Sequence, residues 1–203
     1  ANSKAKGYEG SRDGFGDGVS ASLTYENKDM GLAAAVAANR AIASKFNAYS
    51  DLTGIYTDAV RVTGSLDLGA MGASGLVLGA LWQTAKPTDD VVAVITTTKE
   101  TGKPDTVTNN SFKGLKENAF GITAAYAIPS TPIKLKAQYI SAKSETDAAI
   151  IAGKKELKQD LYGVGADYQI NKQAKFFGIV AQQKRDWKDD KKTNIGLGME
   201  YNF

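Results

Sequence analysis

The residues of this chain that could do chemistry are charged side chains, because its 203 residues include no cysteine and no histidine. This composition excludes thiol nucleophiles, thiolate or imidazole metal ligands, and catalytic triads that use histidine. Two carboxylate pairs, Asp89-Asp90 and Asp189-Asp190, stand beside lysines and are best explained as solvated loop tips. Walker-type glycine loops, G-x-S-x-G elbows and H-E-x-x-H motifs are absent from the sequence. We therefore expect no enzyme activity, no cofactor and no bound metal.

Other charged residues alternate with apolar ones. Lys134, Lys136 and Gln138 are interleaved with apolar residues between positions 133 and 139, and successive side chains of a strand point to opposite faces. A lysine on a lipid face near mid-bilayer costs about 2–4 kcal/mol, so the polar face of such a strand must contact water. The candidate wall residues of a water-filled lumen are Arg61, Asp67, Lys134, Lys136, Gln138, Asp167 and Glu200.

The elements that position these residues are predicted strands, each with an apolar face of period two. The clearest is residues 194–203, where five apolar residues alternate with five others. Residues 32–38 are ambiguous because an alanine-rich run has high helix propensity, and around 177–181 the apolar face is ambiguous because Phe176 and Val180 are also apolar. The nine predicted strands are 19–25, 32–38, 60–68, 76–82, 120–126, 133–139, 162–168, 177–181 and 194–203.

The connections between these strands alternate in length. Residues 26–31, 69–75, 129–132 and 171–173 are short, whereas 40–59, 85–118, 142–159 and 185–192 are longer and charged. Tight turns at one end and long loops at the other are typical of an outer-membrane β-barrel. Aromatic residues lie near the strand ends, where their rings would be at the level of the lipid headgroups, as is common in membrane proteins. The formal net charge of +3, without blocks of like charge, argues against a nucleic-acid partner.

These residues resemble the Gram-negative general porins. The terminal segment Ile195-Gly-Leu-Gly-Met-Glu-Tyr-Asn-Phe203 is similar to the last strand of that family, in which a final phenylalanine signals barrel insertion. The stretch Leu161-Tyr-Gly-Val-Gly-Ala-Asp-Tyr168, followed by a polar turn and Lys175-Phe-Phe-Gly-Ile-Val180, is similar to the hairpin that precedes the last strand in that family. The stretch Asp13-Gly-Phe-Gly-Asp-Gly-Val-Ser-Ala-Ser-Leu-Thr-Tyr25 resembles the family's entry into a mid-barrel strand. The resemblance implies an all-β, antiparallel transmembrane β-barrel, with Tyr201 and Phe203 as its assembly signal.

Strand counting adds a further expectation. If Phe203 lies in the periplasm, nine alternating strands place residues 1–17 in an extracellular loop. Single-chain barrels have even strand numbers, so we expect residues 1–203 to form one barrel segment, the carboxyl-terminal part of a 16-stranded porin. Its partner in closing the barrel would be the remaining amino-terminal part, where the constriction loop would also lie.

The function implied is a passive channel of the Gram-negative outer membrane for ions and small hydrophilic solutes. Membrane lipid, lipopolysaccharide and two further copies in a homotrimer are the expected partners. The alternative from another class is a non-conducting barrel whose long extracellular loops serve an adhesin or anchor. A third possibility, a protease or lipase barrel, would need its catalytic base from outside this sequence. Small inner residues such as Gly121, Thr123 and Gly163 leave space and favour the channel.

Overall fold

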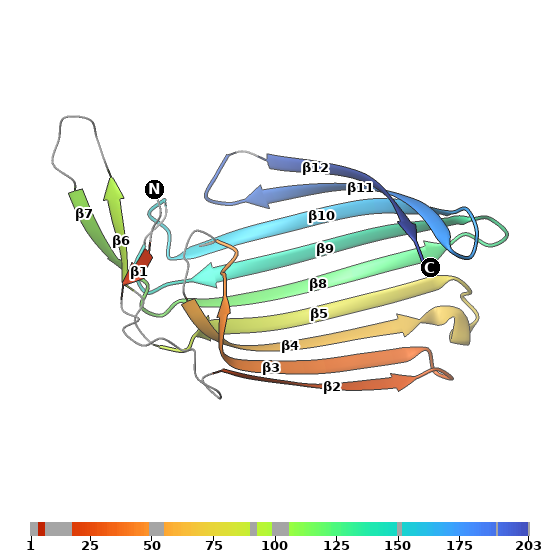
Figure 1. Cartoon of the computed structure of the whole chain (residues 1–203), viewed down its shortest axis with the longest axis horizontal. Helices are drawn as coiled ribbons and strands as arrows, with labels where there is room; N and C mark the ends of the chain where they lie inside the picture. Colours follow the sequence, from red (N-terminus) through yellow and green to blue (C-terminus); the bar gives the residue numbers. More distant parts are fainter. Residues whose placement is uncertain are drawn as a thin grey trace.

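The chain folds into one large antiparallel sheet and one small sheet (Figure 1). The computed structural model describes residues 4–6, 18–48, 55–89, 93–98, 106–149, 152–189 and 191–202. The only helical element in these residues is a 3-10 turn, η1 (Leu68–Met71), and none forms a helix long and apolar enough to cross a membrane.

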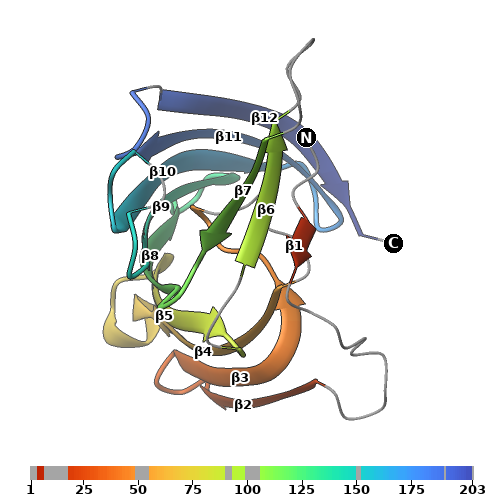
Figure 2. The ribbon, with the colours of Figure 1, turned by 90° about the vertical axis from the view of Figure 1, so that its left-hand side faces the viewer.

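The large sheet has nine strands, in the order β12-β11-β10-β9-β8-β5-β4-β3-β2. Every neighbouring pair is antiparallel, as predicted. Viewed along the strands, the sheet curves around a common axis (Figure 2). In chain order its strands are β2 (Val19–Asn27), β3 (Leu32–Ser44), β4 (Ile55–Asp67), β5 (Leu76–Pro87), β8 (Lys116–Ala127), β9 (Ile133–Glu145), β10 (Glu156–Gln169), β11 (Ala174–Arg185) and β12 (Lys191–Tyr201).

The small sheet was not predicted. It has the order β1-β6-β7 and consists of β1 (Lys4–Lys6), β6 (Ala93–Thr98) and β7 (Thr106–Ser111). It lies at the end of the molecule that carries the long connections (Figure 1). Residues 4–6 belong to the predicted extracellular segment 1–17, whose other residues lie outside the described part. Strands β6 and β7 form a hairpin inside the long predicted loop 85–118, where their threonine-rich sequence shows little apolar alternation.

The predicted sorting of the connections is confirmed. The short turns 28–31, 68–75, 128–132 and 170–173 join strands at one end, and the longer connections fall at the other. The alanine-rich segment is a strand, β3, despite its helix propensity. Its pairing with β2 and β4 on both sides outweighs that propensity, because helix preferences differ by less than about 1 kcal/mol per residue.

One face of the large sheet, which we call the outer face, carries an apolar band. Leu197, Val164 and Ile122 lie on it and are 87%, 62% and 56% exposed. Phe120, Tyr139 and Tyr162 contact each other in series at its edge nearer the long connections, with ring centroids 5.8 and 5.0 Å apart. Tyr168 is six positions along the strand from Tyr162, or about 20 Å. Aromatic rings therefore border the band on both sides, as in membrane barrels.

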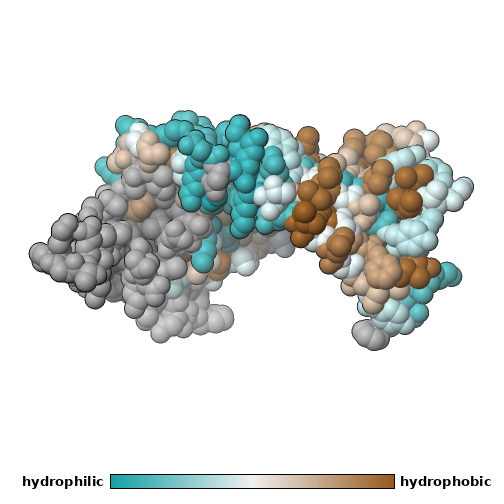
Figure 3. Space-filling model, turned by 90° about the horizontal axis from the view of Figure 1, so that it is seen from above, coloured by the Kyte–Doolittle hydropathy of each residue, from teal (hydrophilic) through white to brown (hydrophobic). Residues whose placement is uncertain are grey.

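Beyond the rings, the outer face becomes charged. Lys143 pairs with Glu145 and lies 3.6 Å from Glu156, and Lys116 lies 2.7 Å from Glu145. Figure 3 shows the same change on the surface seen from above, where hydrophobic residues gather in the half toward the short turns. The strands continue several residues past the apolar band, so β3, β4, β9 and β10 are longer than predicted at this end.

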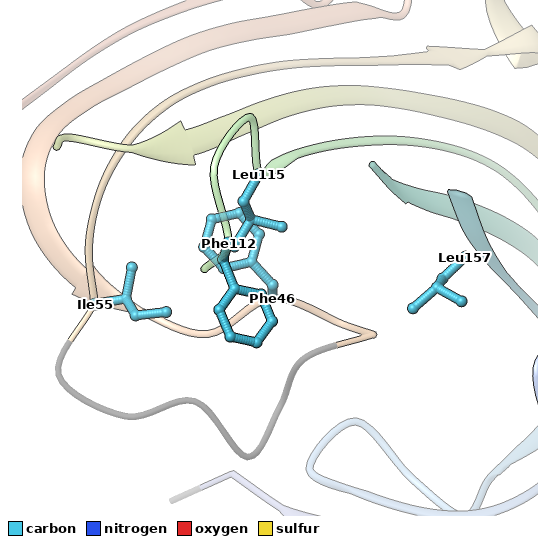
Figure 4. Close-up of a cluster of buried hydrophobic side chains, with 5 residues drawn as sticks. All are labelled: Phe46, Ile55, Phe112, Leu115 and Leu157. Carbon is cyan, nitrogen blue, oxygen red and sulfur yellow. The ribbon is translucent and has the colours of Figure 1, made fainter. Parts of the chain in front are cut away.

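The opposite, inner face is buried at this same end of the sheet. A hydrophobic cluster there is formed by Phe46, Ile55, Phe112, Leu115 and Leu157, each at most 4% exposed (Figure 4). Phe46 and Phe112 come from connections that follow strands, whereas Ile55 and Leu157 belong to β4 and β10. Two connecting segments thus pack against the inside of the sheet.

Hydrogen bonds of Glu117 attach the segment that follows β3 to the sheet. Its carboxylate, which belongs to a residue only 3% exposed, accepts hydrogen bonds from the backbone N–H of Asn47 at 2.7 Å, the Asn47 side-chain amide at 2.8 Å and the Ser144 hydroxyl at 2.9 Å. Because hydrogen bonds to a charged group are stronger than neutral ones, this carboxylate holds residue 47 against β8 and β9.

The assignment of the two faces predicts opposite effects for arginine at adjacent positions. Ile195 is on the outer face and 75% exposed, whereas Asn194 is on the inner face. Ile195→Arg is expected to lower the free energy of unfolding in lipid vesicles by about 2–4 kcal/mol. Asn194→Arg, the matched control, is expected to change it by less than about 0.5 kcal/mol. Equal losses in urea titrations would show that the faces are assigned wrongly.

The contacts of Glu117 predict that its removal is costly. Glu117→Ala deletes three hydrogen bonds to a carboxylate and leaves the hydroxyl of Ser144, a residue only 1% exposed, without this acceptor, which is expected to cost about 2–4 kcal/mol. The control is Glu156→Ala, whose side chain is 65% exposed and lies 3.6 Å from Lys143, and which is expected to cost less than about 0.5 kcal/mol. Urea unfolding of both variants measures the difference, and a similar small loss in each would contradict the proposed fastening.

Candidate functional site

All seven predicted wall residues lie on the inner face of the sheet. The register shows this directly, since β9, β10 and β11 place Lys134, Asp167 and Phe177 in one row and Lys136, Gly165 and Ile179 in the next. The same face carries Gln138 opposite Gly163, Glu200 opposite Lys175, Arg61 opposite Gln83 and Asp67 opposite Val77.

The charges of this face are arranged in pairs near the short turns. The Lys136 ammonium lies 2.6 Å from Asp167 Oδ1, an ion pair along the diagonal between neighbouring strands. Lys175 lies 3.0 Å from Glu200 on the adjacent strands β11 and β12. Lys134 faces Asp167 directly but forms no ion pair within the described residues. On β9 to β12 this part of the inner face therefore carries three lysines and two carboxylates, and Asp67 lies on the same face of β4.

Arg61 and Asp67, both on β4, form hydrogen bonds with groups on β5 and η1. The Arg61 guanidinium donates two hydrogen bonds to Gln83 Oε1, one of them of 2.7 Å from Nε. Asp67 caps the turn η1, because its Oδ1 accepts a hydrogen bond of 2.9 Å from the backbone N–H of Gly69. Asp67 thus has a local structural role that its alternating position alone did not reveal.

The ambiguous face of β11 is settled by its neighbours. Val180 lies opposite Val164 and Ile195 on the outer face, and Ile179 lies opposite Gly165 and Gly196 on the inner face. Lys175 belongs to the inner face and Lys184 to the outer face. The sequence could not assign them, because apolar side chains occupy both faces of this strand.

Large side chains of the inner face lie across glycines of the neighbouring strands. A Cβ atom added to Gly165 or Gly196 would come within 3.0 or 3.1 Å of Ile179, and one added to Gly198 within 2.4 Å of the Phe177 ring. Gln138 covers Gly163 in the same way, at 3.0 Å. These side chains therefore spread along the sheet, and the wall that they form is shallow.

The predicted assembly signal lies partly outside the described residues. Tyr201 is on the outer face of β12 and 48% exposed, but Phe203 is not described. The loop carboxylate pairs are likewise incomplete, since Asp90 and Asp190 fall outside the described part while Asp89 and Asp189 are exposed.

Comparison with solved structures shows that the chain has the fold of an outer-membrane protein, OmpT of Vibrio cholerae, for which two structures match. The chain is similar to OmpT of Vibrio cholerae expressed in the outer membrane, with a TM-score of 0.59 and 16% identity over 91% of this chain and 49% of that one. For OmpT of Vibrio cholerae folded in vitro, the TM-score is 0.54 and the identity 17%, over 89% and 53% of the two chains. The chain thus spans about half the length of these structures.

No curated protein matches the chain. A protein family does, and its description is "Gram-negative porin", with a match that covers residues 1–190. The match includes eight of the strands of the large sheet completely and ends just before β12. The antiparallel sheet, its exposed apolar band and this match together lead to one conclusion: the chain belongs to the Gram-negative porin family and is an outer-membrane protein.

Proposed function

We propose that the inner face of this sheet forms part of the wall of a water-filled channel, through which ions and small hydrophilic solutes diffuse passively. The observation that carries the proposal is the shallow wall, in which Ile179, Phe177 and Gln138 lie over glycines of adjacent strands. A barrel that is plugged by its own side chains needs long groups that project and interlock. Glycines at these positions leave the interior open instead.

The charges of the inner face support a channel for hydrated solutes. Lys134, Lys136 and Lys175, with Asp167 and Glu200, form a polar strip at the level where the outer face is apolar. Charged side chains are stable at that depth only where water reaches them. They would act on passing ions through their electric field, without any bond-making step. We therefore propose a non-enzymatic role.

We further propose that additional strands complete the barrel. Within the described residues β2 pairs only with β3, and β12 only with β11, so each has an edge with unpaired backbone groups. Such edges are unfavourable in lipid, and the related structures are about twice as long as this chain. The 16-stranded barrel, the homotrimer and the contact with lipopolysaccharide that were expected from the sequence remain predictions.

Planar bilayer recordings test the channel. The protein, produced in its full encoded length, is expected to give ohmic current steps. Gly163→Leu is expected to lower the conductance, because the new side chain displaces Gln138, now 3.0 Å from the Cβ position, into the lumen. The control Ala166→Leu adds the same bulk on the outer face and should leave the conductance unchanged. A folded barrel that gives no current would contradict the proposal and favour an adhesin or anchor.

Ion selectivity tests the positive charge on the inner face. Lys134→Gln is expected to shift the reversal potential in a salt gradient toward cation selectivity, since Lys134 forms no ion pair within the described residues and its charge is uncompensated. Lys184→Gln is the control, because Lys184 lies on the outer face beyond the apolar band. Both variants should keep the heat stability of the parent protein. An unchanged reversal potential for Lys134→Gln would place this lysine outside the permeation path.

A further inference from the structure

The middle of the inner face contains a hollow of about 460 Å³. Its floor consists of small residues, among them Ser65, Gly79, Ala125, Gly163 and Gly165, and three longer side chains, Lys136, Gln138 and Ile179, border it. A volume of this size is within the usual range for small-molecule sites. The hollow thus has one cationic and one apolar border.

The register sets the distance between these borders. Lys136, Gly165 and Ile179 lie opposite one another on β9, β10 and β11, and strands of a sheet are about 4.8 Å apart. The backbones that carry the ammonium and the isoleucine are therefore separated by about 10 Å. The residue between them must be glycine, because a Cβ on Gly165 would come within 2.8 Å of the Gly178 carbonyl oxygen and within 3.0 Å of the Ile179 side chain, which leans over it.

The apolar border is unusually exposed for this face. Ile179 is 46% exposed, and Phe177 extends the apolar surface by one row toward the short turns. The other large exposed apolar residues of β9–β12 lie on the outer face or in turns. In a water-filled lumen, covering Ile179 with an apolar group of a solute removes this surface from water and is favourable.

The positive charge at the cationic border is only partly compensated by neighbouring carboxylates. Asp167 pairs with Lys136 at 2.6 Å, which leaves Lys134, two residues away on the same face, without an ion pair within the described residues. If the carboxylate of a solute bound between these lysines, it and Asp167 would supply two negative charges for the two ammonium groups. A simple inorganic cation would be repelled by these lysines, and an uncharged sugar would leave the charge of Lys134 uncompensated.

We propose that the hollow is a subsite for small carboxylates that bear an apolar group, with the carboxylate at Lys136, on its border, and Lys134, one row further along β9, and the apolar group against the exposed surface of Ile179. The inference rests on the proposed channel and names a class of solute for it. The distance of about 10 Å suits a single aromatic ring or a short branched chain between the two borders.

Benzoate and acetate separate the two parts of the subsite, because both are monovalent carboxylates and only benzoate has a ring. In bilayers with the full-length protein in potassium chloride, each is titrated against the chloride current. Benzoate is expected to reduce the single-channel current at a half-blocking concentration about tenfold below that of acetate, the factor given by covering roughly 55 Å² of apolar surface.

Variants identify the residues that cause the difference between benzoate and acetate. Ile179→Asn is expected to raise the half-blocking concentration of benzoate severalfold and to leave that of acetate unchanged, whereas Lys134→Gln with Lys136→Gln is expected to weaken both. Ile140→Asn is the matched control, since Ile140 lies on the inner face of β9 but does not border the hollow. If Ile179→Asn does not fold, Ile179→Thr keeps the branched shape while reducing the apolar surface.

The outcomes distinguish the subsite from the channel. A conducting protein on which benzoate and acetate act equally overturns the subsite and leaves the channel standing. Benzoate block that persists in Ile179→Asn also overturns it. A silent, folded protein contradicts the channel, and calorimetric titration of that folded protein with both anions then tests the subsite alone: tighter binding of benzoate supports it, and equal or absent binding overturns it.

Discussion

The structure depends on the pairing of backbone hydrogen bonds between neighbouring strands. In lipid, no water is available to satisfy N–H and C=O groups, so a chain that crosses as strands must pair every one of them with an adjacent strand. In this sheet the pairing is antiparallel between all neighbours from β2 to β12, and the short turns and the side-chain pattern set its register. Once the register is fixed, so is the face of each side chain, because a shift of one residue would exchange the two faces.

The surroundings of the outer face change along the strands, and the inner face changes with them. Between the aromatic rings the outside is apolar and the inside carries Lys136 and Asp167. Beyond the rings the outside carries Lys143 and Glu145, and the inside packs Ile55 and Leu157 against connecting segments. The same strands thus have a lipid-facing part and a part with an ordinary hydrophobic core, which the buried Glu117 carboxylate helps to fasten.

The packing of the inner face bears directly on the proposed function. Side chains such as Ile179 fill the space over neighbouring glycines, so the sheet is well packed although little of it projects inward. Ion pairs between adjacent strands hold Lys136 and Lys175 close to the wall as well. These contacts, together with the lysine excess on β9 to β12, are the physical basis of the proposed channel and its subsite.

The sequence by itself determined the nine strands, the side of the short turns and the common face of Lys134, Lys136 and Asp167, because period-two alternation is a local property of each strand. Only the tertiary structure decided the face of β11, where both faces carry apolar residues and the pairing with β10 and β12 chooses between them. It also decided how far the strands extend toward the long connections. At that end the inner face packs against a hydrophobic core, so apolar residues such as Leu157 lie on the inner face and the polar ones on the outer face, the reverse of the arrangement in the apolar band. The hollow beside Ile179 belongs to this second group, because its borders come from different strands and their distance depends on the register.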